Sequence, residues 1–369
     1  MTEAPSRAGY DVVVVGAGLI GLASAWRASL RGLSVIVVDR ERAGAGASRV
    51  AAGMLAPVTE ANFGEEELLR LNLAANRRWR SFADELGADE ILYRRQGALV
   101  VAVDRDDAEE LRRLHDFQRS LGLDAEWLVP SECRRLEPSL SPRCAGGIFA
   151  PQDHQVDPVS VVRALAARVE VLAGDGVAAI RGDGVELESG RRIGAEQVVL
   201  AAGSWSGSGV QGVPRLPVRP VKGQLLGLRR PAGRPLAGHV LRTLRCYLVD
   251  RGDGRVVLGG TMEEKGFDTT PTVDALYRLM EAAYEVLPDV SELEFEEARV
   301  GLRPATPDGM PLIGRAPESD SLVIATGHFR NGVLLTPVTA DAVAAILCGE
   351  EPPLDVAPFS PQRFEVAVR

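Results

Sequence analysis

The stretch that decides the fold is residues 10–39, YDVVVVGAGLIGLASAWRASLRGLSVIVVD. The β-branched apolar run at its start predicts a strand over residues 10–15, and the residues up to Arg31 predict a helix that stops at Gly32. Residues 34–38 predict a second strand. A strand, a helix and a strand within about 30 residues form half of a Rossmann fold. The chain therefore begins with an α/β unit built on parallel strands.

The turn between the first strand and the helix carries Gly16-x-Gly18-x-x-Gly21. These glycines permit a tight turn, close approach of the backbone to a pyrophosphate, and close packing of helix on strand. The helix N-terminus offers free N–H groups to the anion. Asp39 lies 23 residues after Gly16, where a carboxylate accepts hydrogen bonds from an adenosine ribose. The region is predicted to bind a dinucleotide without a 2′-phosphate.

The same glycine spacing recurs at Gly207-x-Gly209-x-x-Gly212, followed by Pro214 and Pro217. The prolines prevent a helix from starting where a phosphate site requires one. We expect a loop there. The repeat also shows that this glycine spacing says little without its strand and helix.

Further along, periodicity and turn residues predict a mixture of elements. Helices are predicted at 65–86, 106–121, 156–169, 273–287 and 333–347, and strands at 97–103, 177–180, 184–187, 197–201, 218–228, within 246–259, and at 322–325. We expect an α/β protein with a discontinuous Rossmann-like binding domain and a mixed, largely antiparallel α+β substrate domain. The first is predicted at 1–90, 154–215 and 300–369, and the second at 91–153 and 216–299.

Composition excludes several classes of function. The chain has 369 residues, 46% of them hydrophobic, and a formal charge of −9, which disfavours nucleic acid as a partner. No apolar run is long enough for a membrane span, and the short polar N-terminus does not look like a signal peptide, so a cytoplasmic protein with no membrane partner is expected. The four cysteines form no C-x-x-C pair, and no metal site is predicted.

Three further segments resemble the D-amino-acid oxidase family of flavoproteins, and within it the glycine oxidase group. They are GASRVAAGML at 46–55, VVLAAGSW at 198–205, and GLRP at 301–304 taken together with GHFRNG at 327–332. Each is a small-residue turn beside a predicted strand, where backbone N–H groups can approach a flat ring system. The resemblance runs from Tyr10 to about Leu347.

This resemblance implies FAD as the cofactor. A helix start at Asn331 to Leu334 would stabilise negative charge on a reduced flavin. The residues that it assigns to cofactor binding are Gly16, Gly18, Leu19, Ile20, Gly21, Asp39, Arg40, Ser48, Ala52, Gly53, Met54, Leu55, Val177, Ala202, Gly203, Trp205, Arg303, Arg330, Asn331, Gly332, Val333 and Leu334.

The resemblance also implies the substrate site. A guanidinium matches the two oxygens of a carboxylate, and Arg303 corresponds to the family's carboxylate anchor. Arg330 and Tyr247 correspond to its second pocket arginine and its active-site tyrosine, and Met262 to a pocket methionine. The implied reaction passes a hydride from the α-carbon of a small amino acid or amine to the flavin, and molecular oxygen then gives hydrogen peroxide. Of the four histidines, His328 lies nearest in sequence to the turn that is assigned to flavin binding. We expect its ring to pack against neighbouring residues rather than to transfer protons.

Several alternatives stay open. Monomeric sarcosine oxidases hold their flavin through a cysteine that would fall near Gly301 and carry a lysine where Leu334 stands, so the FAD here is expected to be non-covalent. Sarcosine, small D-amino acids and D-proline remain candidate substrates beside glycine, and a role in thiamin biosynthesis is implied only by the resemblance. Three other functions also stay open: a dehydrogenase with another electron acceptor, an NAD enzyme, and a flavin protein without catalytic activity. Assembly into a homo-oligomer is a further open alternative.

Overall fold

A computed structural model describes residues 9–231, 235–317 and 319–367. The chain divides into two compact units, and each is built from separate pieces of sequence. The first unit comprises Met1–Arg49, Val159–Val221 and Leu302–Arg369, and the second Val50–Pro158 and Lys222–Gly301. Residues 50–90, which the sequence placed with the dinucleotide-binding domain, belong by their contacts to the second unit.

The first unit is a sheet covered by helices. Its elements are β1 (Tyr10–Val15), α1 (Leu19–Ser29), β2 (Val35–Asp39), α2 (Ala47–Val50), α6 (Pro158–Ala166), β8 (Glu170–Ala173), β9 (Val177–Arg181), β10 (Gly184–Leu187), β11 (Arg192–Leu200), β17 (Leu312–Arg315), β18 (Leu322–Thr326) and α8 (Thr336–Leu347). Short 3-10 turns are η1 (Gly203–Gly207), η3 (Phe329–Asn331), η4 (Ala357–Phe359) and η5 (Pro361–Ala367).

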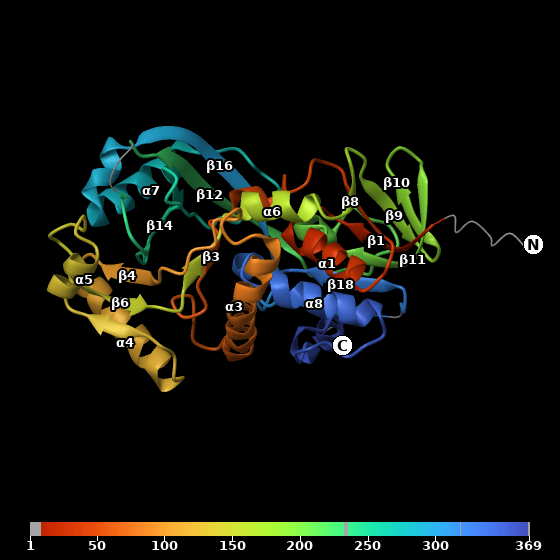
Figure 1. Cartoon of the computed structure of the whole chain (residues 1–369), viewed down its shortest axis with the longest axis horizontal. Helices are drawn as coiled ribbons and strands as arrows, with labels where there is room; N and C mark the ends of the chain where they lie inside the picture. The colour runs from red at the N-terminus through yellow and green to blue at the C-terminus, as the bar shows by residue number, and fades with distance from the viewer. Residues whose placement is uncertain (1–8, 232–234, 318, 368–369) are drawn as a thin grey trace, which may run out of the picture. The chain divides into compact units, whose positions relative to one another are not determined.

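The strands of this sheet run in the order β17-β18-β11-β1-β2-β8, and β9 and β10 pair beyond β11. The pairs β18–β11, β11–β1, β1–β2 and β2–β8 are parallel, whereas β17 and the β9–β10 hairpin are antiparallel. Residues 12–15 are buried on both faces of β1, as expected for a central parallel strand. Helices α1 and α8, far apart in sequence, lie side by side against this sheet (Figure 1).

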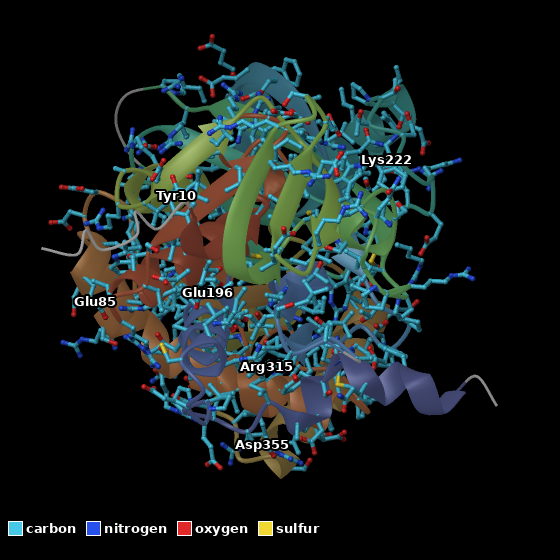
Figure 2. All side chains as sticks on the ribbon, turned by 90° about the vertical axis from the view of Figure 1, so that its right-hand side faces the viewer. Tyr10, Glu85, Glu196, Lys222, Arg315 and Asp355 are labelled. Atoms are coloured by element: carbon cyan, nitrogen blue, oxygen red, sulfur yellow. The ribbon has the colours of Figure 1, made fainter. Side chains whose placement is uncertain are left out.

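Side chains near the sheet's edge strengthen this unit. Arg315, labelled in Figure 2, donates to the side chain of Gln197 at 3.2 Å and to the carbonyl of Ile346 at 2.9 Å. Tyr10, also labelled there, donates its hydroxyl to Glu170 at 2.9 Å. The contacts of Arg315 with Gln197 and of Tyr10 with Glu170 each join residues more than one hundred positions apart in the sequence.

The second unit contains a mostly antiparallel sheet and its helices. Its elements are β3 (Met54–Leu55), α3 (Glu66–Leu86), β4 (Ala98–Ala102), α4 (Arg105–Ser120), β5 (Glu126–Leu128), α5 (Pro130–Leu136), β6 (Gly146–Ala150), β7 (His154–Gln155), β13 (Val240–Arg242), β14 (Tyr247–Asp250), β15 (Arg255–Gly259), α7 (Val273–Val286) and η2 (Pro288–Glu292). The chain changes unit within β12 (Arg219–Arg229) and β16 (Glu294–Ala305).

The large sheet has the order β16-β12-β15-β14-β13-β4-β6-β5, in which β13 and β4 are parallel. The pairs β12–β15, β15–β14, β14–β13, β4–β6 and β6–β5 are antiparallel. The predicted α/β class and its two kinds of sheet are thereby confirmed. No strand was predicted from the sequence over residues 146–150, where the structure has β6. A side chain at Gly147 would lie 2.5 Å from the carbonyl of Val100, which explains a glycine inside this strand.

The predicted loop at Gly207 to Gly212 is confirmed. After η1 no helix follows, and Gly209 and Gly212 have φ angles of 93° and 79°. A Cβ at Gly212 would lie 2.1 Å from the carbonyl of Ile180, so glycine is required there by the packing of the loop on β9.

Candidate active site

The parallel strands of the first unit end at one edge of their sheet. Strand β1 leads into Gly16, β2 ends at Asp39, β11 is followed by Ala201, and β18 by Gly327. The chain passes from β1 to β2 on one side, whereas β11 lies on the other side of β1. In open α/β sheets, ligands bind at the carboxyl ends of the strands where the strand order reverses. The dinucleotide motif occupies this position.

The three motif glycines meet different constraints. Gly16 has a φ of 109°, and a Cβ there would lie 2.4 Å from the carbonyl of Ala201. A Cβ at Gly21 would lie 1.9 Å from the carbonyl of Gly16, so the helix packs too closely for any side chain. Gly18 has an ordinary φ of −78°, and its Cβ would meet only Ser48 Oγ, at 3.4 Å. The space over Gly18 therefore fits the approach of a pyrophosphate to the backbone.

Asp39 fits the ribose role from the other side of the turn. Its Oδ2 accepts from the backbone N–H of Ala17 at 2.7 Å, and its Oδ1 from that of Glu41 at 2.8 Å. A carboxylate oxygen can accept more than one hydrogen bond, so both oxygens of Asp39 can also accept from ribose hydroxyls. Ser48 Oγ accepts from the N–H of Leu19 at 3.1 Å. These contacts fix the conformation of the turn between β1 and α1.

Arg40 and Trp205 form a flat surface at the same edge. The Arg40 guanidinium lies 3.9 Å from the centre of the Trp205 ring, a cation–π contact between the ends of β2 and β11. Val177 begins β9 and is buried. The Arg40–Trp205 pair and Val177, which the sequence resemblance assigns to cofactor binding, thus belong to the first unit.

Hydrogen bonds join the turn after β11 to strands β16 and β18. Ser204 Oγ donates to the carbonyl of Leu302 at 2.9 Å, and Ser206 Oγ to Thr326 Oγ1 at 2.9 Å. Consequently the AAGSW turn and the GLRP segment, separated by about a hundred residues, are adjacent in the first unit. The sequence could not show this adjacency, because it depends on where β16 ends.

The two candidate arginines of this unit lie close in sequence to one antiparallel bridge, between Ala305 and His328. Arg303 lies two residues before Ala305 in β16, and Arg330 lies two residues after His328 in η3, so the bridge brings together the two segments that carry them. Arg303 is half-buried and Arg330 is exposed. A guanidinium group can bind an anion such as a carboxylate through two hydrogen bonds.

His328 is a packing residue in the structure. Its ring is buried, and Nε2 lies 3.0 Å from Thr339 Oγ1. Burial lowers the pKa of His328 to about 3. The imidazole is therefore neutral at physiological pH, which agrees with the expectation that it does not transfer protons.

The helix predicted from Val333 begins three residues later in the structure, because α8 begins at Thr336, so Asn331 to Leu334 lie before the helix. Residues 329–331 form η3, and the N–H of Leu335 donates to the carbonyl of Asn331 at 2.8 Å. Pro337 stands in the first turn of α8, where its missing N–H costs nothing. Asn331, Val333 and Leu334 are buried in this turn.

In the second unit, the Ala52 to Leu55 turn depends on close packing. Gly53 has a φ of 75°, and a Cβ there would lie 2.0 Å from the carbonyl of Val156. The N–H of Val156 donates to Gly53 O at 2.9 Å, and β3 pairs with β7. Glycine is therefore the residue that this turn requires.

Arg251, which the sequence did not single out, holds this turn. Its buried guanidinium donates to the carbonyls of Val156, at 2.8 Å, and of Ala52, and to Gln155 Oε1 at 2.9 Å. Burial lowers the pKa of Arg251 to about 10, so the side chain remains charged at neutral pH. Because Asp250-Arg251-Gly252-Asp253-Gly254 reads as an exposed hairpin turn, nothing in the local sequence indicates a buried cation.

Tyr247 opens β14, and its ring lies against Gly259 of β15. A Cβ at Gly259 would lie 2.3 Å from the Tyr247 hydroxyl oxygen, so glycine makes room for the ring. Tyr247 and Met54 pack against one hydrophobic cluster that contains the buried Ala52. Met262 follows β15 and is 62% exposed. The second unit thus brings Ala52, Met54 and Tyr247 together.

Asp153 is a second buried charge that the sequence did not reveal. It accepts hydrogen bonds from the N–H of Val58 at 3.0 Å, from that of Thr59 at 2.8 Å and from Thr59 Oγ1 at 2.7 Å. Burial raises the pKa of Asp153 to about 6, although these bonds oppose the shift. It holds the segment that follows the Ala52 to Leu55 turn.

Over residues 9–231, 235–317 and 319–367, no group of three or more His, Cys, Asp or Glu side chains is arranged to hold a metal ion. Over the same ranges, no helix combines the length and apolar character needed to cross a membrane.

The fold and the carboxyl-end site define a Rossmann-like protein that binds an adenine dinucleotide. Residues 11–346 match the family described as "FAD dependent oxidoreductase", and the chain belongs to that family. It is accordingly an FAD-dependent oxidoreductase of amino acids or amines. The resemblance seen in the sequence is thereby confirmed.

Individual relatives agree with this placement. The chain is 33% identical to a glycine oxidase of Geobacillus kaustophilus over 95% of this chain and 96% of the relative. It is 30% identical to the hydrogen cyanide synthase subunit HcnC of Pseudomonas aeruginosa over 96% of each. A crystal structure of the Geobacillus kaustophilus glycine oxidase superposes with a TM-score of 0.88 at 31% identity, covering 96% of this chain and 98% of that one.

Proposed function

We propose that this protein is a glycine oxidase that also accepts other small amines. It would convert glycine to an imine, which water hydrolyses to a keto acid and ammonia, while oxygen is reduced to hydrogen peroxide. The observation that supports this most is the Ala305–His328 bridge, which brings together the segments that carry Arg303 and Arg330 at the carboxyl edge of the dinucleotide-binding sheet. Two guanidinium groups there suit a substrate with one carboxylate.

The proposed cofactor is non-covalent FAD, which supplies hydride acceptance from the substrate α-carbon. Gly16, Gly18 and Gly21 let the backbone approach its pyrophosphate, and Asp39 accepts from its ribose. The sequence has cysteines only at positions 133, 144, 246 and 348, none near Gly301 or the segments assigned to flavin binding on either side of it. No thiol is therefore proposed for covalent attachment.

The substrate residues act by positioning. Arg303 would bind both carboxylate oxygens, and Arg330 would add a second positive charge. Tyr247 would donate its hydroxyl to the substrate, and Met262 would limit the space for a side chain. Once the substrate amine has lost its proton to solvent, no protein base is needed, in keeping with a neutral, hydrogen-bonded His328.

The decisive test is peroxide formation with glycine under air, measured in a coupled peroxidase assay. Flavin bleaching without peroxide would replace the oxidase with a dehydrogenase. Anaerobic flavin reduction rates with glycine, sarcosine, D-alanine and D-proline would then rank the substrates. A clear preference for sarcosine would make the protein a sarcosine oxidase with non-covalent FAD.

Product analysis separates a second candidate, suggested by the identity to HcnC along both chains. A glycine oxidase releases ammonia and a two-carbon 2-oxo acid, glyoxylate, whereas a hydrogen cyanide synthase releases cyanide. Cyanide in place of ammonia would decide against the proposed function.

The anchor is tested by Arg303→Ala, with Arg192→Ala as a matched control on an exposed strand position of the same unit. Loss of a bidentate charged pair should raise the KM for glycine about 100-fold. Arg192→Ala should leave it unchanged. An unchanged KM in Arg303→Ala would remove Arg303 from the proposed site.

A further inference from the structure

Lys222 is the most deeply buried lysine that this chain offers. Lys222, which is labelled in Figure 2, is 1% exposed. Its ammonium donates to Asp268 Oδ2 and to the carbonyl of Thr270, both at 2.6 Å. Lys222 and Lys265 are the only lysines beside forty arginines. A buried charge costs free energy unless it is paired and hydrogen-bonded, and Lys222 is both.

Gln224 stands two residues further along β12, on the same face of the strand. Its Nε2 donates to Glu263 Oε1 at 2.8 Å and to Thr272 Oγ1 at 3.1 Å, and its Oε1 accepts from the N–H of Thr272 at 2.9 Å. The backbones of Lys222 and Glu263 exchange two hydrogen bonds of 2.9 Å. Lys222 and Gln224 thus hold the segment 261–272 at its beginning, middle and end.

The segment lies largely at the surface of the second unit. Residues 264–271 are all exposed, with Phe267 46% exposed, so the contacts of Lys222 and Gln224 are its links to buried side chains of β12. Three of the contacts that hold the segment involve charged groups: Lys222 with Asp268, Lys222 with the carbonyl of Thr270, and Gln224 with Glu263. The hydrogen bond from Lys222 lowers the pKa of Asp268 to about 2. Burial would raise the pKa of Glu263, but hydrogen bonds from Thr261 and Gln224, with the charges of Lys222 and Lys265, lower it.

The side-chain type at position 222 also matters. An ammonium is a compact charge that can donate to two oxygens of different residues. A guanidinium is planar, bulkier and better suited to a two-oxygen fork. In a chain that otherwise uses arginine almost throughout, a lysine here matches the space between Asp268 and the carbonyl of Thr270.

We propose that Lys222 is a positioning residue that fixes the 261–272 segment and, through it, the place of Met262, so that it determines how large a substrate side chain the enzyme accepts. The part that concerns substrate size rests on the proposed function, in which Met262 borders the pocket. The part that concerns the segment itself rests only on contacts within the second unit.

A lysine-specific endoprotease tests the segment directly. In Lys222→Met the only remaining lysine is Lys265, in the middle of the segment, so cleavage there reports its order alone. We expect Lys222→Met holoenzyme to be cleaved after Lys265 at least tenfold faster than wild type. Arg229→Met, a surface change on the same strand, should be cleaved at the wild-type rate.

A milder variant keeps the test independent of folding. Asp268→Asn alters only the half-exposed partner of Lys222, so the fold should be retained. It should also speed cleavage after Lys265, by a smaller factor. Wild-type cleavage rates in both Lys222→Met and Asp268→Asn would overturn the proposal.

The substrate consequence is measured as the ratio of kcat/KM for D-proline to that for glycine. Lys222→Met should change this ratio at least fivefold, with FAD content and Tm kept, and Lys222→Arg should not restore it. An unchanged ratio with faster proteolysis would overturn the link to Met262. If wild type oxidised neither substrate, the proposed function would fail, while the proteolysis result would still decide whether Lys222 orders the segment.

Discussion

The two units hold their candidate site residues by different means. In the first unit, glycines and backbone N–H groups shape the Gly16 to Gly21 turn, and Asp39 caps it from the end of the next strand. In the second unit, three buried charged side chains each hold one segment: Arg251 the turn at Ala52, Asp153 the backbone at Val58 and Thr59, and Lys222 the segment around Asp268. Backbone geometry organises one site region and buried charge organises the other.

The two regions should therefore lose their structure through different kinds of substitution. A turn made of glycines is lost through steric overlap, which is insensitive to pH and salt. The stability of a segment held by a buried ionisable side chain changes when that side chain is replaced or changes its protonation state. Variants in the two units should therefore differ in both the size and the pH dependence of their effects.

The largest effect is expected for Gly21→Val in the first unit. Even the Cβ would lie 1.9 Å from the carbonyl of Gly16, so α1 cannot keep its place on β1. We expect loss of FAD, read as the absence of visible flavin absorbance in the purified protein. Gly182→Ala is the matched control, since no atom lies within 4 Å of a Cβ there. A flavin-loaded Gly21→Val protein would contradict the packing described for this turn.

Arg251→Met should have the next largest effect. The substitution keeps an apolar stem but leaves three buried oxygens without their donor. The free energy of unfolding should fall by about 2–4 kcal/mol, measured by urea denaturation. Arg229→Met, at an exposed ion pair with Glu296, should stay within about 0.5 kcal/mol of wild type. A loss as small as that of the control would show that the turn does not depend on Arg251.

Asp153→Asn should reveal a pH dependence in the second unit. Because the pKa of Asp153 is raised to about 6 from an ordinary 3.8, the folded state binds its proton more tightly than the unfolded state. The stability that protonated Asp153 contributes is present below pH 4 and is lost as pH rises to about 6, by up to about 3 kcal/mol. Relative to the variant, wild type should lose stability across this range. Parallel pH curves for the two proteins would refute the assignment.

The smallest change is expected at His328 in the first unit. With its pKa lowered to about 3, the ring carries no charge between pH 5 and 8. Its contribution to stability is present above pH 6.5 and is lost as pH falls from 6.5 towards 3. In NMR spectra, with His328→Gln used for assignment, its ring proton should not titrate between pH 5 and 8. A midpoint near 6.5 would mean that the ring is solvated.

The same contrast explains how much the sequence could predict. The turn at Gly16 to Gly21 was predictable because its constraints come from residues within a few positions of one another, and from a strand and helix with clear periodicity. The adjacency of Ser204 to Leu302 was not, since it depends on the course of β16 through residues that carry no strong periodicity.

The buried charges were invisible for a related reason. Arg251 lies in a stretch of Asp and Gly that is typical of an exposed turn, and its acceptors come from residues 52, 155 and 156. Lys222 offered one signal, the rarity of lysine in an arginine-rich chain, although rarity alone does not indicate burial. Local sequence records a residue's neighbours along the chain, whereas the desolvation of a charge is decided by neighbours in space.

The distribution of lysine has a practical consequence for chemical labelling. Acylating reagents such as succinimidyl esters attack unprotonated amines that solvent can reach, and guanidinium groups do not react with them. Lys222 is 1% exposed, whereas Lys265 lies in the exposed segment. Of the side-chain amines, Lys265 is therefore the one that a fluorescent dye would modify, placing a single reporter on the segment that carries Met262 without introducing a new residue.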